Sequence, residues 1–217
     1  MTEGPVVAGA LAGDPRAGEF ARIVESVHLR YAREVVLAYE LCPFLHDPAS
    51  AFGRFCVVLE REPDLATAVE LVLAAPGVVH LVYPLVDGSC HAMERYGNVL
   101  HERIRREALA RGDRDPPVHA TFHPRMEGDA NTPQRRIGLV RRAPDPFVQF
   151  VPQGLTGGGS KFLDPDTLDL AALLATPKKP PSRVGSLGPD ELSALLATLV
   201  DIRRERDARY AGYFDAP

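Results

Sequence analysis

The sequence predicts an α/β protein with a mostly parallel or mixed sheet of about four strands and helices packed on it. Short β-branched runs alternate with amphipathic helical patterns of ten or more residues, which is typical of βαβ units. Glycine and proline bound these runs, as they do at strand ends. The 217 residues are 45% hydrophobic and 25% charged, the balance of a globular chain large enough for a sizeable core.

The first predicted helix begins at Ala17, after a segment over 1–16 that is rich in Gly, Ala and Pro and is expected to be a flexible tail. Apolar residues recur along it at spacings of three and four, which gives one buried face. Because a proline disfavours the α conformation in the residue before it, we expect this helix to end at Cys42, before Pro43.

Two strands and a helix come next. The runs over 54–60 and 78–84 are β-branched and read as strands, and the pattern over 64–75 predicts a helix between them. Asp64 precedes that helix and is its expected N-cap.

The second half of the sheet is predicted from similar signals. A long helix follows Ser89, its expected N-cap, and stops before Gly112. Strands are expected over 118–122 and 147–151. The connection over 124–146 has little periodicity, apart from a short apolar run, Ile-Gly-Leu-Val, that could form a further strand.

The predicted organisation is a tail over 1–16, an α/β body over 17–152, and a Gly/Pro-rich linker with C-terminal helices over 153–217. The last helix carries a leucine stripe between residues 192 and 199. This appendage is expected to pack on the body, and its stripe could also mediate a homodimer.

Composition excludes some partners. The net charge of −4 and the absence of Trp argue against nucleic-acid binding. No apolar run approaches the roughly 20 residues that a membrane span needs. Three cysteines, an odd number, argue against a disulfide framework and favour a reducing cytoplasm.

Cys42 is the first candidate for chemistry. The partially negative end of the preceding helix faces it and opposes thiolate formation, so activation requires His46, an arginine or a metal ion. The alternative is a buried cysteine at a helix end. Cys56 is expected in the core, whereas Cys90 stands near a helix start, where the dipole favours a thiolate.

His123 is the second candidate, because it follows a predicted strand, and strand ends face the ligand crevice of parallel α/β sheets. His119 is four residues earlier, roughly 13 Å along a strand, so the two cannot easily share one ion. A turn histidine without a special role is the alternative.

The third candidate is a set of arginines that includes Arg141 and Arg142 in the irregular connection. Guanidinium groups bind carboxylate and phosphate groups with paired hydrogen bonds. This segment could therefore bind an anion, or it could be a solvated basic loop.

Three separated pieces resemble a bacterial family of domains of unknown function. They are Leu-Cys-Pro-Phe over 41–44, Phe-His-Pro over 122–124, and Arg-Ala-Pro-Asp-Pro over 142–146. The resemblance places Cys42, His123 and Arg142 in one site and adds Asn131 as a substrate-binding residue. This chain has Gln149 where the family usually has a histidine, so a metal site there would be altered.

Three hypotheses follow. The first is an enzyme of unknown reaction acting on a small anionic metabolite, with Cys42 as nucleophile or metal ligand, His123 as base or ligand and Arg142 as anion clamp. Arg141, Asn131 and Gln149 would help to bind the substrate. The second is a haem- or transition-metal-binding protein that uses Cys42 with His46, His123 or Met126 as ligands. The third is a non-catalytic binding or oligomerisation module.

Overall fold

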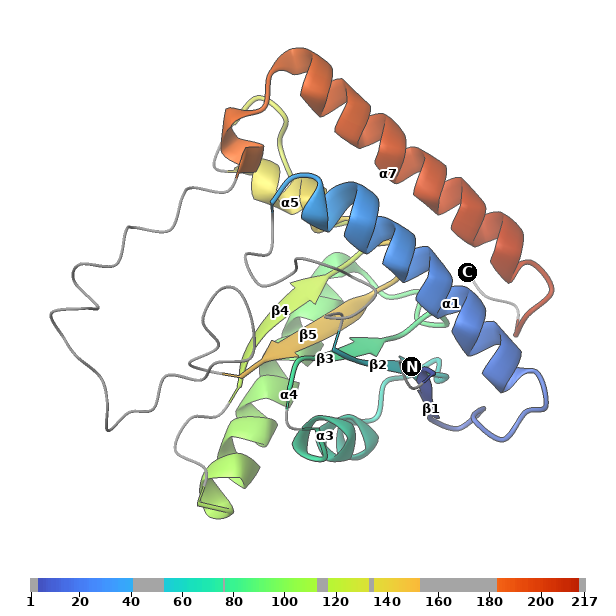
Figure 1. Ribbon diagram of the computed structural model, residues 1–217. Coiled ribbons are helices and arrows are strands. Elements are labelled where there is room, and N and C mark those ends of the chain that lie inside the picture. The colour runs from blue at the N-terminus through green and yellow to red at the C-terminus, as the bar shows by residue number, and fades with distance from the viewer. Residues whose placement is uncertain are drawn as a thin grey trace, which may run out of the picture.

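Figure 1 shows the computed structural model, which describes residues 4–40, 53–75, 77–112, 117–132, 135–152 and 183–214. Within these residues the chain forms a five-stranded mixed sheet with helices on both faces, which confirms the predicted α/β class. None of the described helices is both long enough and apolar enough to cross a lipid bilayer.

The strand order across the sheet is β1-β2-β3-β5-β4. The neighbours β1, β2 and β3 run parallel, whereas β5 lies antiparallel between β3 and β4. The sheet is therefore mixed, and β5 is inserted between two strands that precede it in the chain. The strands are β1 (Val6–Ala8), β2 (Arg54–Val58), β3 (Val79–Val82), β4 (Val118–Phe122) and β5 (Phe147–Val151).

The N-terminal segment differs from the expected flexible tail over 1–16, because residues 6–8 form the edge strand β1. Val6 and Val7 pair with Cys56 and Val57 of β2. Gly9 follows with a φ of +95°, a conformation that favours glycine and turns the chain away from the sheet. A run of only three residues is too short to show strand periodicity in the sequence.

One face of the sheet is covered by α1 (Ala17–Tyr31), which continues as a π-helix, η1 (Ala32–Leu37). Val24 and Val27 of α1 are fully buried in a core that they share with β2 and β5. The helical conformation ends at Leu37, earlier than the expected end at Cys42.

The C-terminal helix α7 (Pro189–Tyr210) lies antiparallel against α1 (Figure 1). Leu192, Leu195 and Ile202 are buried in the same core as α1 and the sheet. The leucine stripe thus packs within the chain, which removes the observation that motivated a homodimer through this helix. In the described residues, the predicted appendage therefore packs on the body through α1.

The other face of the sheet is covered by α3 (Leu65–Leu73) and α4 (Cys90–Ala110) (Figure 1). Both expected N-caps are present. Asp64 Oδ2 accepts the Thr67 N–H at 2.8 Å, and Ser89 Oγ accepts the Ala92 N–H at 3.1 Å.

The connection between β4 and β5 contains α5 (Arg136–Val140), so the Ile-Gly-Leu-Val run is helical and the expectation of a strand there is wrong. The backbone of residues 127–128 passes very close to this helix. A Cβ at Gly138 would overlap the carbonyl oxygen of Glu127, so this packing requires a glycine. The 3₁₀ helix η4 (Arg183–Ser186) packs beside α5.

Candidate functional site

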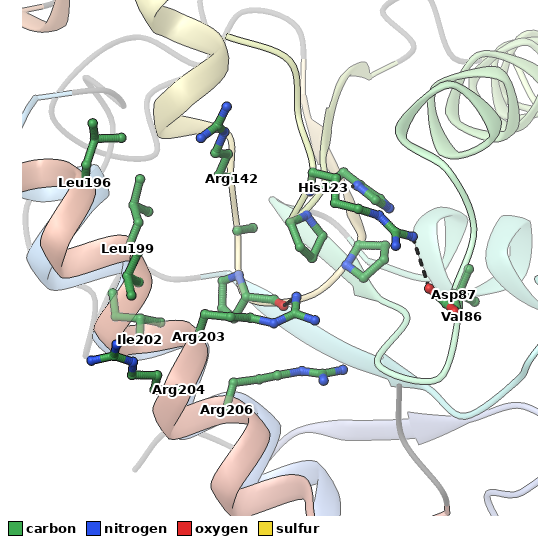
Figure 2. A pocket seen from close by; sticks show the side chains of 16 residues that line it. Val86, Asp87, His123, Arg142, Leu196, Leu199, Ile202, Arg203, Arg204 and Arg206 are labelled. Atoms are coloured by element: carbon green, nitrogen blue, oxygen red, sulfur yellow. Dashed lines mark hydrogen bonds and ion pairs between the residues drawn. The ribbon is translucent and has the colours of Figure 1, made fainter. Parts of the chain in front are cut away.

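A cavity of about 640 Å³ lies between α7 and the ends of the strands (Figure 2). One wall is formed by α7 residues from Leu196 to Arg206. The opposite wall comes from three loops, at residues 86–87, 123–125 and 142–146, each of which adjoins a strand. The cavity is therefore at an edge of the sheet, where the sequence predicts a site.

The backbone brings two of the predicted site residues into this cavity. The N–H of His123, just after β4, donates to the carbonyl oxygen of Arg141 at 3.1 Å. This bond joins the end of β4 to the segment that leads into β5. As a result, His123 and Arg142 both line the cavity, although 19 positions separate them in the sequence.

The His123 ring is fully committed to hydrogen bonds. Its Nδ1 accepts the Arg125 N–H at 3.0 Å, so its Nε2 carries the proton and donates to the Gly88 carbonyl oxygen at 3.1 Å. The side chain is 1% exposed, and burial is the main reason why its pKa is lowered. His123 is thus a neutral ring that ties β4 to the β3–α4 loop, and neither nitrogen is available as a base in this arrangement.

Arg142 is oriented by one hydrogen bond, from its Nε to the Met126 carbonyl oxygen at 3.0 Å. Its side chain is half-buried in the cavity wall, across from Leu196 and Leu199 in Figure 2. No carboxylate partner of Arg142 occurs among the residues that the structure describes.

Three other arginines of the cavity have carboxylate partners. The pairs are Arg125 with Asp87 at 3.0 Å, Arg203 with Asp207 at 3.2 Å, and Arg206 with Asp145 at 2.9 Å. Within each pair, the carboxylate largely offsets the positive charge of the arginine.

The fifth arginine of the lining, Arg204, is exposed and points away from Arg142 in Figure 2. Among the described residues, Arg142 is therefore the one half-buried arginine of the cavity without a carboxylate partner.

A buried polar network lies behind the cavity, centred on Asp145, which is 0% exposed. Its carboxylate accepts hydrogen bonds from Arg206 Nε at 2.9 Å and Tyr210 Oη at 2.7 Å, and it lies 3.1 Å from His28 Nε2. Burial alone would raise the pKa of Asp145, but hydrogen bonds and charge from His28, with help from Arg206 and Tyr210, outweigh burial and lower it. The network fixes Arg206, whose Nη2 also donates to the Pro84 carbonyl oxygen.

The other predicted substrate-binding residues do not line the cavity. Asn131 is exposed in a turn, where its N–H donates to Asp129 at 2.9 Å. The Arg141 guanidinium lies over the Phe122 ring, 5.9 Å from its centroid. Gln149 is in the middle of β5, opposite His80 in the antiparallel register.

Cys42 and His46 lie outside the described residues. The predicted roles of Cys42 as nucleophile or as ligand therefore stay predictions from the sequence. The two described cysteines are buried. Burial raises the pKa of Cys56 to about 11 and also raises that of Cys90, which opposes the predicted thiolate at the start of α4. Among the described residues, no three His, Cys, Asp or Glu side chains are grouped to hold a metal ion.

Sequence reasoning missed the contribution of α7 to the cavity. Arg203 and Arg206 are three positions apart and so lie on one side of the helix. Their spacing is visible in the sequence, but only the packing of α7 against α1 shows that this side faces the strand ends.

No protein-family model, no curated protein and no solved structure matches the chain.

Proposed function

We propose that this protein binds a small organic anion in the cavity between α7 and the strand ends, with Arg142 as the group that holds the anionic end. The observation that carries the proposal is the half-buried guanidinium of Arg142 in the cavity wall, which has no carboxylate partner among the described residues. A guanidinium that is oriented through Nε keeps its two terminal nitrogens for a carboxylate or phosphate group.

The shape of the site supports this proposal. A volume of about 640 Å³ falls within the range of roughly 300–1,000 Å³ that is typical of small-molecule sites. The one carboxylate in the cavity lining, Asp87, is paired with Arg125, so it does not compete for Arg142. The resemblance noted in the sequence predicts a role for the same arginine.

Binding is the part of the predicted function that the described residues support. Both nitrogens of His123 are used in hydrogen bonds, so a catalytic step would depend on a residue such as Cys42. Catalysis by Cys42 stays a prediction from the sequence.

The proposal is tested by isothermal titration calorimetry at low ionic strength with acetate, benzoate, octanoate, citrate and phosphate. We expect at least one anion to bind. We expect Arg142→Gln to weaken that binding about 10- to 100-fold, since a hydrogen-bonded charge pair contributes about 1.5–3 kcal/mol.

The matched control is Arg106→Gln, which removes the same charge from an exposed position on α4, on the opposite face of the sheet (Figure 1). It should leave the affinity within about twofold of the wild type, because exposed charges at a distance are screened by salt. The proposal is wrong if no anion binds, or if both variants weaken binding equally.

A further inference from the structure

The wall of the cavity that faces Arg142 is apolar. Leu196 and Leu199 are partly buried there, and Val200 is 52% exposed at the same end of α7. Ala143 and Pro144 continue the apolar surface on the other side. Small-molecule sites commonly combine a mostly apolar lining with a few oriented polar groups. This lining therefore favours a ligand that has an apolar portion as well as a negative charge.

The apolar residues of α7 precede the paired arginines along the helix. A rise of 1.5 Å per residue puts Leu196 about 10 Å from Arg203, whereas Val200 is one turn from Arg203, where the two groups adjoin. Arg142 lies across from the apolar group, as Figure 2 shows. An acid group held by Arg142 would therefore have an apolar surface directly beside it.

The charge of the site indicates the kind of acid. Among the described residues, Arg125, Arg203 and Arg206 are already paired with carboxylates, and the unpaired Arg204 is exposed, where salt and water screen its charge. Arg142 is left as the one half-buried positive charge, which matches one negative charge. A carboxylate carries a single charge at pH 7, whereas a phosphate monoester carries about −1.5 to −2.

We propose that the ligand is a monocarboxylate with an apolar body, whose carboxylate is held by Arg142 while its hydrocarbon portion lies against Leu196, Leu199 and Val200. This inference rests on the proposed function, that the cavity binds an anion. It adds the chemical class of the ligand and the direction in which the ligand lies.

The test is a calorimetric series of straight-chain carboxylates from acetate to decanoate, each below its micelle concentration. Burial of one methylene group is worth about 0.8 kcal/mol, so affinity should rise about fourfold per carbon while the chain stays within the cavity. Octyl phosphate, with the same chain and more charge, should bind more weakly than octanoate.

Two variants test the contacts of the carboxylate and of the hydrocarbon chain separately. Arg142→Gln should weaken every member of the series by a similar factor. Val200→Asn should weaken octanoate severalfold and acetate much less, because acetate has no hydrocarbon chain to lie against this wall. Val99→Asn is the matched control, since Val99 is 54% exposed on α4 and is not part of the cavity.

The outcomes distinguish this inference from the proposed function. Arg142-dependent binding whose strength does not change with chain length would overturn the inference and leave the anion site standing. Tighter binding of octyl phosphate than of octanoate would do the same. Failure of every carboxylate and phosphate to bind would overturn both.

Discussion

Asp145 is the residue whose replacement should reveal most about this fold. It is 0% exposed and is the common partner of His28, Arg206 and Tyr210. Asp145→Asn keeps the shape of the side chain and removes its charge. The Arg206 guanidinium, at 3% exposed, would then lose the buried carboxylate that lies 2.9 Å from its Nε.

The expected cost follows from the burial of the pair. Removing one partner of a buried ion pair typically costs about 3–5 kcal/mol, because the other charge stays buried without compensation. In a chain of this size, 1 kcal/mol corresponds to about 2–4 °C in Tm, so the midpoint should fall by about 6–20 °C. Tyr210→Phe, which removes one hydrogen bond to Asp145, should cost about 1–3 kcal/mol.

The assay is urea unfolding followed by circular dichroism, since the chain has no Trp. The matched control is Asp201→Asn, which removes the same charge from a residue that is 61% exposed and pairs with Arg30; it should cost less than about 1 kcal/mol. The double variant with Tyr210→Phe should be less unstable than the sum of the two single variants, because both act on the same network. A loss below 1 kcal/mol for Asp145→Asn would refute this reasoning.

The pH dependence of the free energy of unfolding gives a second test of the role of Asp145. The pKa of Asp145 is lower in the folded protein than its ordinary value of 3.8, so the carboxylate stabilises the fold above pH 3.8. That contribution is lost as the pH falls from 3.8 through the folded pKa. The Asp145→Asn variant should lack this part of the acid-induced loss of stability.

Other positions give independent tests of the fold. The pKa of His123 is lowered from 6.5, so the neutral ring stabilises the fold above pH 6.5, and the free energy of unfolding declines as the pH falls below that value. In urea titrations between pH 6.5 and 5, the free energy of unfolding of His123→Gln should decline less steeply than that of the wild type. Equal slopes would contradict the neutral state of the His123 ring. Gly138→Ala should cost about 3 kcal/mol or more, because its Cβ would meet the Glu127 backbone, whereas Gly18→Ala, whose Cβ meets nothing within 4 Å, should be neutral or stabilise by up to about 1 kcal/mol in thermal unfolding. Asp64→Ala removes the cap of α3 and should cost about 1 kcal/mol; no change in Tm would argue against that hydrogen bond.

The elements that the sequence predicts well are those whose signals are local. The caps of α3 and α4 join Asp64 and Ser89 to residues three positions later, so the pattern contains the whole interaction. The placement of β1 and α5 depends on distant partners. Val6 and Val7 form a strand because β2 offers an edge, and α5 packs at Gly138 against the backbone of Glu127, where a side chain would not fit.

The same division holds for the candidate site. His123 can be singled out from the sequence because it follows a predicted strand, and Arg142 because it belongs to a set of arginines and to one motif of the resemblance. The facing wall depends on α7, and no local pattern shows that Leu199 or Arg203 faces the strand ends. The roles of the two predicted residues also depend on contacts. Hydrogen bonds to Arg125 and Gly88 occupy both nitrogens of the His123 ring, whereas Arg142 has no carboxylate partner in the described part of the chain.

The packing of α7 on α1 has a consequence for how the chain is made. Phe20, near the start of α1, has its ring partners at Tyr210, Tyr213 and Phe214, about 190 residues later. At about 5–20 residues per second, a ribosome needs roughly 10–40 s to make the intervening chain. During that interval the face of α1 that packs on α7 lacks this partner, so we expect the nascent chain to expose apolar surface there until α7 has emerged.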